Sequence, residues 1–406
     1  MIEQPSDHKK VVSDSFPIRC FRTAQFLIMS VLIAFPLLEG VSYVLKQTIP
    51  WRPIDRAGGD NRLLSPNWSA ETTEFFSELH DFRGYRYESF IGWKSEKRAG
   101  RFINLDDDGN RITANNPTSL PTTVFDFYGG STIWGFGVSD TNTIPSRFAR
   151  LSPGIIARNF GEQARNSRQE LNYFLNNAVR GRVGNIVIFY DGFNDVKHQC
   201  SGVNGPFGDA RTGTIRSVMA QVDDNGQIRN LATGQKFRNV VAFLLPNTTA
   251  LIERITRRPF GQLRLDMNLK ESNICHDSEM ADLVAENLVQ NWRTARLVAN
   301  DHGATFFAIL QPLPYTADVR QPYYNPGYDE VIKAVYPIIK AKAERFGWFI
   351  DGEDWLNGRT DLYIDACCHV NEKGSELIAE EILRRTIPSE TDRNRRSSIS
   401  SAPQSQ

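Results

Sequence analysis

The chain carries no net formal charge, because its 47 lysines and arginines are balanced by 47 aspartates and glutamates. This balance gives no electrostatic reason to expect nucleic acid or a strongly acidic polymer as a partner. The 406 residues are 40% hydrophobic and 11% aromatic. That content is sufficient to bury a substantial core, in one large domain or two small ones.

Cysteine is scarce, and none of the five cysteines has the Cys-x-x-Cys spacing that is typical of zinc sites. Four of them follow the N-terminal region and permit two disulfides in three pairings: Cys200, Cys275, Cys367 and Cys368. Adjacent cysteines fit disulfide geometry poorly, so the last two could instead each reach one of the first two. An alternative is a zinc site in which His198 and His276 join the first two cysteines.

An apolar run over residues 24–45 is about long enough to cross a bilayer as a helix. No Ala-x-Ala cleavage site follows it, which favours an uncleaved anchor over a signal peptide. The basic residues cluster more tightly before the run than after it. The positive-inside rule therefore predicts a cytoplasmic stub over 1–23, a membrane anchor over 24–46 and a remainder outside the cytoplasm, in the periplasm or the extracellular space. Glu39 is placed near the outer end, where a carboxylate can reach the interface.

The segments at the two ends of the soluble part differ from the middle. Residues 47–118 are rich in Pro, Gly, Asp, Asn and Arg with interspersed aromatics, and we interpret them as an irregular or partly β lead-in that packs on the main domain. Residues 388–406 contain almost no apolar side chains and are predicted to be disordered.

Between these ends, over 119–387, short apolar runs alternate with segments of helical periodicity. The predicted strands are 123–128, 155–160, 185–190, 304–310 and 348–350, and the predicted helices are 168–179, 280–300, 328–346 and 371–385. Such alternation implies a parallel sheet with helices on both faces. The stretch 197–279 is too long for a plain connection and is expected to be an inserted subdomain or an active-site lid.

Four short segments that border the predicted strands and helices contain the candidate chemistry. Gly129-Gly130-Ser131 follows the first strand and opens a helix, so the serine hydroxyl is expected at the carboxyl edge of the sheet. Asn159-Phe160-Gly161 follows the second strand, and Gly192-Phe193-Asn194-Asp195 follows the third. Asp365 to His369 precedes the last helix. Considered alone, each segment also has a purely structural interpretation. Ser131 would then be a helix N-cap, and the residues of the other segments would be caps or turns.

Taken together, the four segments resemble the blocks of the SGNH (GDSL-like) hydrolase superfamily, named for a Ser, a Gly, an Asn and a His. Ser131, Gly161, Asn194 and His369 match the four blocks in order, and the resemblance covers roughly 120–385. It implies a three-layer α/β/α sandwich with a central parallel sheet of about five strands. It further implies a bacterial, membrane-anchored member with no settled substrate.

The roles implied by the resemblance agree with the chemistry of the residue types. A serine hydroxyl needs an adjacent base, and His369 would take the proton of Ser131 and later return one to the leaving group. The backbone N–H groups of Ser131 and Gly161 and the side-chain amide of Asn194 would stabilise the oxyanion. This chemistry requires no metal and no organic cofactor.

The sequence departs from the family pattern at the acid that orients the histidine. That acid normally stands three residues before the histidine, where this chain has Ala366, and Asp365 stands four before. We predict that Asp365 is the third member of a triad, with a bulge in the loop absorbing the extra residue. Otherwise a backbone carbonyl orients His369, and the site is a Ser–His dyad.

The leading functional hypothesis is an extracytoplasmic esterase that removes O-acetyl or other short acyl groups from a surface or secreted carbohydrate. One alternative is a polysaccharide O-acetyltransferase, in which a sugar hydroxyl intercepts the same acyl-enzyme. The other is a carbohydrate-binding protein that keeps the fold without catalysis, an alternative that the shifted acid supports.

Overall fold

A computed structural model describes residues 15–49, 67–80, 84–118, 123–219, 240–256 and 272–387. The chain divides into two compact units, one of residues 1–56 with 230–263 and one of residues 57–229 with 264–406. The predicted disordered tail over 388–406 and the first fourteen residues of the predicted stub lie outside the described residues.

The larger unit is built on a parallel sheet of five strands. Across the sheet the order is β4 (Ile155–Asn159), β3 (Thr123–Gly129), β5 (Ile186–Asp191), β6 (Thr305–Leu310) and β7 (Phe349–Asp351). In chain order this is 2-1-3-4-5, so the direction in which successive strands are added reverses between β3 and β5. In open parallel sheets ligands bind at the carboxyl ends of the strands beside such a switch point.

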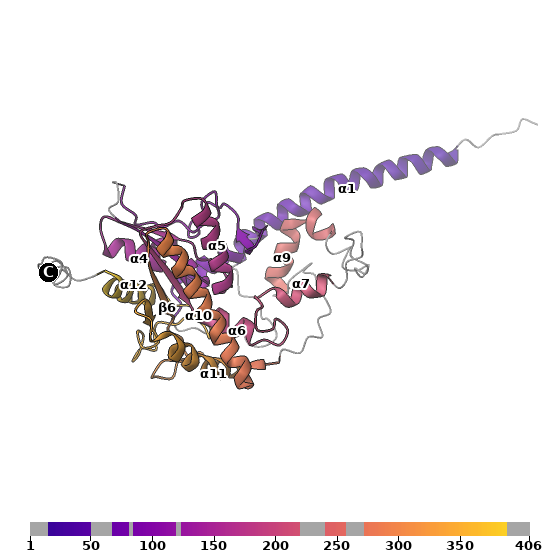
Figure 1. The fold of residues 1–406 in the computed structure, drawn as a ribbon. Helices are drawn as coiled ribbons and strands as arrows, with labels where there is room; N and C mark the ends of the chain where they lie inside the picture. Colours follow the sequence, from indigo (N-terminus) through magenta and orange to yellow (C-terminus); the bar gives the residue numbers. More distant parts are fainter. Residues whose placement is uncertain are drawn as a thin grey trace, which may run out of the picture. The chain divides into compact units, whose positions relative to one another are not determined.

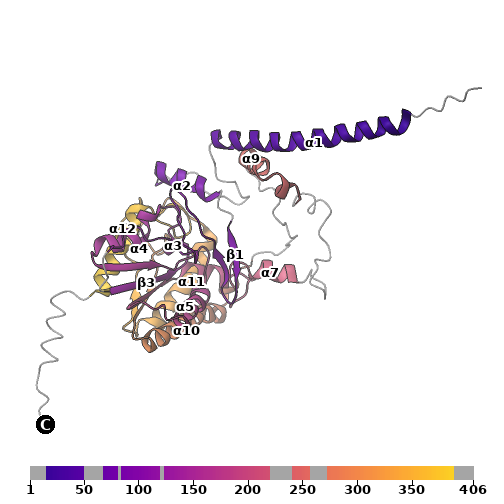
Figure 2. The same cartoon turned by 90° about the horizontal axis from the view of Figure 1, so that it is seen from above.

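Helices cover both faces of the sheet, which gives three layers (Figure 2). One face packs against α5 (Ser167–Val179), α6 (Phe193–Gln199), α10 (Ser278–Asp301) and α11 (Pro326–Ala343), and the other against α4 (Ile144–Leu151) and α12 (Glu372–Thr386). Successive strand residues point to opposite faces, so Phe127 belongs to one core and Tyr128 to the other. The predicted parallel sheet between helical layers is confirmed.

Most of these helices begin after a side chain that accepts a backbone N–H. Asn166 accepts from Gln169 N in a capping box at the start of α5, and Asn371 accepts from Gly374 N at the start of α12. Asp277 does the same for α10. Such caps satisfy donors that have no partner inside the helix, and they set where each helix leaves the sheet edge.

The remaining elements of this unit are short. The part before the sheet forms α2 (Ala70–His80) and an antiparallel hairpin of β1 (Tyr85–Glu88) and β2 (Gly92–Ser95). The turn α3 (Ser131–Trp134) and the 3-10 turn η2 (Asp140–Asn142) follow β3, whereas α7 (Thr212–Met219) and η3 (Ile274–His276) lie between α6 and α10.

Arg111, from the segment before the sheet, is buried with all five of its N–H groups engaged. Its Nε donates to Asp140 Oδ1 at 2.6 Å. The two terminal nitrogens donate to four backbone carbonyls, those of Phe102, Trp134, Gly135 and Val138. The guanidinium also lies 4.5 Å from the Trp134 ring. One side chain therefore joins the lead-in segment to the loop that follows α3.

The sequence left the disulfide pairing open, and the structure has Cys200 bonded to Cys275 while Cys367 and Cys368 are free thiols. The end of α6 runs beside the start of η3, and Ile274 N–H donates to Cys200 O at 2.9 Å. This backbone pairing brings the two cysteines together. It also excludes the alternative zinc site, since a disulfide has no thiolate to offer a metal.

The smaller unit contains α1 (Ser15–Thr48) and α9 (Pro246–Thr256), which lie side by side (Figure 1). The carboxylate of Glu39 on α1 accepts the backbone N–H groups of Asn247 and Thr248, each at 2.8 Å, at the start of α9. Ser42 bonds to the Thr248 hydroxyl at 3.0 Å. The acidic residue within the predicted anchor is thus the N-terminal cap of a second helix.

Among the residues whose side chains the structure describes, no helix is both long and apolar enough for a membrane span.

We predict that Arg111→Lys lowers the free energy of unfolding by about 3–5 kcal/mol, the usual cost of leaving partners of a buried charge unpaired. A lysine has three donors and cannot serve the four carbonyls and the carboxylate that Arg111 joins. Urea unfolding followed by fluorescence measures the change. Arg101→Lys is the matched control, because the Arg101 side chain is 74% exposed and pairs only at the surface with Glu74. Equal stability of the two variants would contradict the role of Arg111.

Candidate active site

Ser131 is the first residue of α3 and stands directly beyond the end of β3. Two glycines precede it because their surroundings leave no room for a side chain. A Cβ on Gly129 would lie 2.5 Å from Ile133 Cγ1, and one on Gly130 would lie 2.4 Å from Asn194 Nδ2. The serine side chain is buried except for 8% of the residue surface. The turn thus presents one hydroxyl at the edge of the sheet.

Ser131, His369 and Asp365 form one continuous chain of hydrogen bonds. His369 Nε2 lies 2.7 Å from Ser131 Oγ, and His369 Nδ1 lies 2.5 Å from Asp365 Oδ2. All three residues are buried, and Asp365 is only 5% exposed. A carboxylate at Nδ1 favours the tautomer in which Nε2 is free to accept the serine proton.

The extra residue between Asp365 and His369 is absorbed by a turn that the same aspartate closes. Asp365 Oδ1 accepts the backbone N–H of Cys367 at 2.9 Å and that of His369 at 3.4 Å, while Oδ2 faces the imidazole. Asp365 therefore bonds His369 Nδ1 despite the extra residue, in the geometry of a triad rather than of a dyad held by a backbone carbonyl.

The loop that contains Asp365 and His369 is held from both sides. Below its tip, Ile364 N–H donates to His369 O at 3.0 Å and Asn371 N–H donates to Leu362 O at 2.8 Å. At the tip, the hydroxyl of Thr132 donates to Cys368 O at 3.3 Å. This last bond ties the histidine loop to the residue that follows the nucleophile.

Phe136 lies against the imidazole of His369. Its ring centroid is 4.3 Å from that of His369, with an interplanar angle of 33°. Phe136 belongs to the loop after α3, whose backbone carbonyls accept from Arg111. The aromatic face limits how far the imidazole can rotate away from Ser131.

Of the three predicted oxyanion donors, Ser131 N–H and the Asn194 amide have a hydrogen available, and Gly161 N–H is engaged elsewhere. The N–H of Ser131 is at the first position of a helix, where no intrahelical acceptor exists. Asn194 Nδ2 donates one hydrogen to Arg165 O at 2.7 Å, which orients the amide and leaves its second hydrogen available. Gly161 N–H donates to Asn159 Oδ1 at 3.0 Å. Gly161 therefore becomes a donor to substrate only if that bond opens.

Gly161 nevertheless has a clear steric reason to be glycine. A Cβ there would lie 2.5 Å from Trp134 N and 2.9 Å from both the carbonyl carbon and Cγ2 of Ile133. The position after β4 thus packs directly against the backbone of the nucleophile turn. Asn159 reinforces the same contact, because its Nδ2 donates to Ile133 O at 2.8 Å.

Three carboxyl groups in the region around Asn194 are buried: those of Glu170, Asp191 and Asp195. Burial raises the pKa of Asp195 to about 8, with the nearby charge of Asp191 adding to the shift. Burial likewise raises the pKa of Asp191 to about 6, against hydrogen bonds from Glu170 and Trp292, and raises that of Glu170 well above its usual range. Asp195 also accepts the N–H and hydroxyl of Ser167. The bonds from Ser167 to Asp195 fix the start of α6, where Asn194 is placed.

One cluster within the described residues has side chains suited to a metal ion, and it is formed by Cys367, Cys368 and His369. Their ligand atoms lie within 4.8 Å of one another. Both imidazole nitrogens of His369, however, are already bonded to Ser131 and Asp365. A metal here would take the base out of the triad.

Neither a family model nor a curated protein matches the chain. Similar solved structures include a member of the lipolytic G-D-S-L family from Veillonella parvula, the α/β hydrolase LAE5 from the metagenome of Lake Arreo, and an acetylxylan esterase from Geobacillus stearothermophilus. They are 13%, 14% and 12% identical, with TM-scores of 0.35, 0.34 and 0.34. The matches cover 64%, 66% and 66% of this chain and 96% of each of those chains.

The residue roles rest on the geometry of this chain itself. The structure brings the four sequence blocks to one edge of a five-stranded parallel sheet, as the SGNH resemblance implies. Sequence reasoning missed Thr132, Phe136 and Arg111. Thr132 and Phe136 stand close to the nucleophile in sequence, a signal that could have marked them, but nothing in the pattern around Arg111 distinguishes it from a surface arginine.

We predict that Asp365→Asn lowers kcat/KM for a small acetyl ester by about a hundredfold to ten-thousandfold, because the amide no longer favours the productive tautomer of His369. Steady-state hydrolysis measures the loss. Asp361→Asn is the control, since Asp361 stands in the same segment but its side chain is 51% exposed and pairs with Arg359. Activity of Asp365→Asn close to wild type would rule out the triad role.

Proposed function

We propose that the chain is a serine esterase that cleaves short acyl esters through an acyl-enzyme on Ser131. The observation that supports this function is the continuous hydrogen-bonded chain from Ser131 through His369 to Asp365. A protein that only bound carbohydrate would have no need for a buried imidazole with its two nitrogens between a hydroxyl and a carboxylate.

The proposed reaction follows from the positions of these atoms. His369 Nε2 accepts the proton of Ser131 as Oγ attacks the ester carbonyl, and Asp365 stabilises the imidazolium that forms. The negative charge on the carbonyl oxygen is stabilised by Ser131 N–H and by the second amide hydrogen of Asn194. The imidazolium then protonates the leaving alkoxide, and the same base activates the water that releases the acid.

Short acyl groups fit the site best. The reacting carbonyl must come to about 3–3.5 Å from the serine oxygen. Ser131 and His369 are 8% and 7% exposed, and the Phe136 ring lies over the imidazole. The surrounding side chains thus leave little open surface at the nucleophile, which favours acetyl over long acyl chains. An O-acetylated carbohydrate is the substrate class we propose.

We propose further that this activity lies outside the cytoplasm, on a chain held at the membrane by residues 24–46. The apolar run and the basic residues before it support the anchor. The Cys200–Cys275 disulfide supports the location, because such bonds form and persist in oxidising compartments.

Labelling with a fluorophosphonate probe tests the nucleophile. We expect the wild-type chain to be labelled at Ser131, and Ser131→Ala to lose both the label and about ten-thousandfold to a millionfold of its acetyl-ester hydrolysis. Ser152→Ala is the matched control, because Ser152 precedes β4 at the opposite edge of the sheet and should leave both readouts unchanged. Absence of labelling on a folded wild-type chain would favour binding over catalysis. The ratio of free acetate to acetylated sugar in the products distinguishes a hydrolase from a transferase.

Membrane fractionation tests the anchor. The full chain should remain in the membrane pellet after an alkaline carbonate wash and enter the supernatant only with detergent. External protease should digest the catalytic unit in cells whose outer envelope is opened, and should leave a tag at residue 1 protected. Release by carbonate alone would contradict the anchor.

A further inference from the structure

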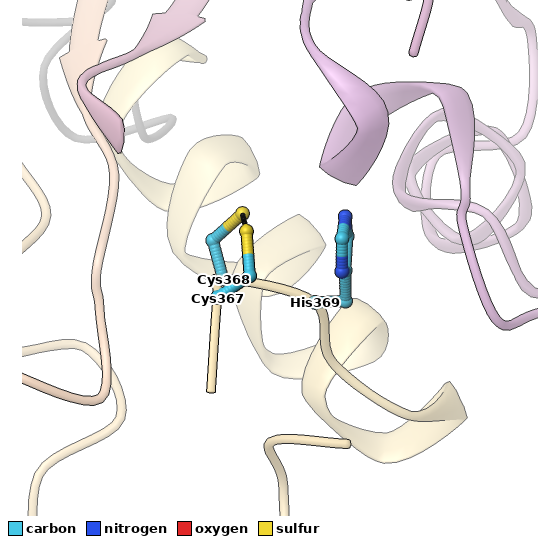
Figure 3. A group of neighbouring side chains, drawn as sticks. All are labelled: Cys367, Cys368 and His369. Atoms are coloured by element: carbon cyan, nitrogen blue, oxygen red, sulfur yellow. Dashed lines mark hydrogen bonds between the residues drawn. The ribbon is translucent and has the colours of Figure 1, made fainter. Parts of the chain in front are cut away.

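The loop between Asp365 and His369 contains two adjacent thiols that the proposed reaction does not use. Figure 3 shows the sulfur atoms of Cys367 and Cys368 turned toward each other beside the imidazole of His369. The two Sγ atoms are 2.7 Å apart. Cys368 is 3% exposed, whereas Cys367 is only partly buried, so the pair is reached from solvent through Cys367.

We propose that Cys367 and Cys368 form a thiol–disulfide exchange site, and that their oxidation by a disulfide compound lowers the activity of the neighbouring triad. The exchange site depends only on the short distance between the two sulfur atoms, and not on the esterase function. The effect on activity rests on the proposed esterase function.

The exchange is balanced by one disulfide molecule, written R–S–S–R. One cysteine thiolate attacks it, which forms a mixed disulfide and releases R–S⁻. The second cysteine sulfur then attacks the first, the bond between the two cysteines forms, and the second R–S⁻ leaves. Two electrons pass from the cysteine pair to R–S–S–R, and the two thiol protons end on the two R–SH products.

The local charges favour this chemistry at Cys368. Burial alone would raise the pKa of its thiol. The hydrogen bond from Cys367 and the neighbouring His369 outweigh that effect and lower the pKa below its usual value. The thiolate is the reactive form in exchange, so Cys368 is suited to attack the mixed disulfide that forms on Cys367, the sulfur that solvent reaches.

The bond between adjacent cysteines is expected to be reversible. Adjacent Cα atoms are about 3.8 Å apart across a trans peptide, which is shorter than the roughly 4.4 Å lower limit of ordinary disulfides. The peptide between the two cysteines must therefore twist when the bond forms. Strained disulfides are the more easily reduced and are the ones found in regulation.

The twisted peptide belongs to the segment between Asp365 and His369, whose backbone positions the triad. The N–H of Cys367 donates to Asp365 Oδ1 on one side of the pair, and Cys368 O accepts the Thr132 hydroxyl on the other. His369 follows immediately. A change in this short segment alters the position of the acid, of the base and of the link to the nucleophile helix together.

Equilibration of the full chain in glutathione buffers, from fully reduced to fully oxidised, tests the exchange site. Differential alkylation and mass spectrometry should detect loss of two hydrogens in the peptide with Cys367 and Cys368, reversed by reduction. Hydrolysis of p-nitrophenyl acetate should fall by about tenfold to a hundredfold on oxidation, since a misplacement of about 1 Å can cost that much. The double variant Cys367→Ser/Cys368→Ser should have equal activity in both buffers, because its loop has no thiol to oxidise.

Each part of the proposal has its own contrary result. Thiols that remain open to alkylation in the oxidised buffer would overturn the exchange site. A bond that forms while hydrolysis stays constant would overturn its control of catalysis. Absence of hydrolysis in both forms would overturn the esterase function and the control with it, and the alkylation data alone would then decide the exchange site.

Discussion

The catalytic side of the larger unit depends on the guanidinium of Arg111. Its five N–H groups are satisfied by one carboxylate and four carbonyls, three of which belong to the end of α3 and the loop that follows it. That loop contains Phe136, which packs on the ring of His369. An arginine from the segment before the sheet thus limits the position of a base far away in sequence. The rigid fork of the guanidinium suits this task, because its donors are fixed in one plane.

The parts of the molecule that could be predicted from sequence are those with a local pattern. Apolar runs identified the strands because a parallel strand buried on both faces has no polar alternation. The four blocks located Ser131, Asn194 and His369, since each stands where a strand ends or a helix begins and parallel strands share one carboxyl edge. The bulge at Asp365 was also predicted, because only one extra residue had to be absorbed.

The parts that could not be predicted depend on contacts between distant segments. The pairing of Cys200 with Cys275 follows from a backbone bridge between α6 and η3, and spacing alone permitted three pairings. The bond from Gly161 N–H to Asn159 depends on a side-chain orientation. From the sequence, Glu39 was interpreted as a charge near the outer end of an apolar run. In the structure it caps a helix more than two hundred residues further along the chain. No periodicity in the sequence encodes such partners.

The members of the triad are held by two different kinds of force. Ser131 follows a buried strand, and glycines pack its turn against neighbouring backbone, so moving it would disrupt the core. His369 and Asp365 belong to a loop held by a few hydrogen bonds and one aromatic contact, each of which contributes roughly 1 kcal/mol. A productive site must keep its groups within about 0.5 Å of the required geometry. A change in this loop can therefore remove activity at little cost in folding free energy, which makes it the place where catalysis can be adjusted separately from the fold.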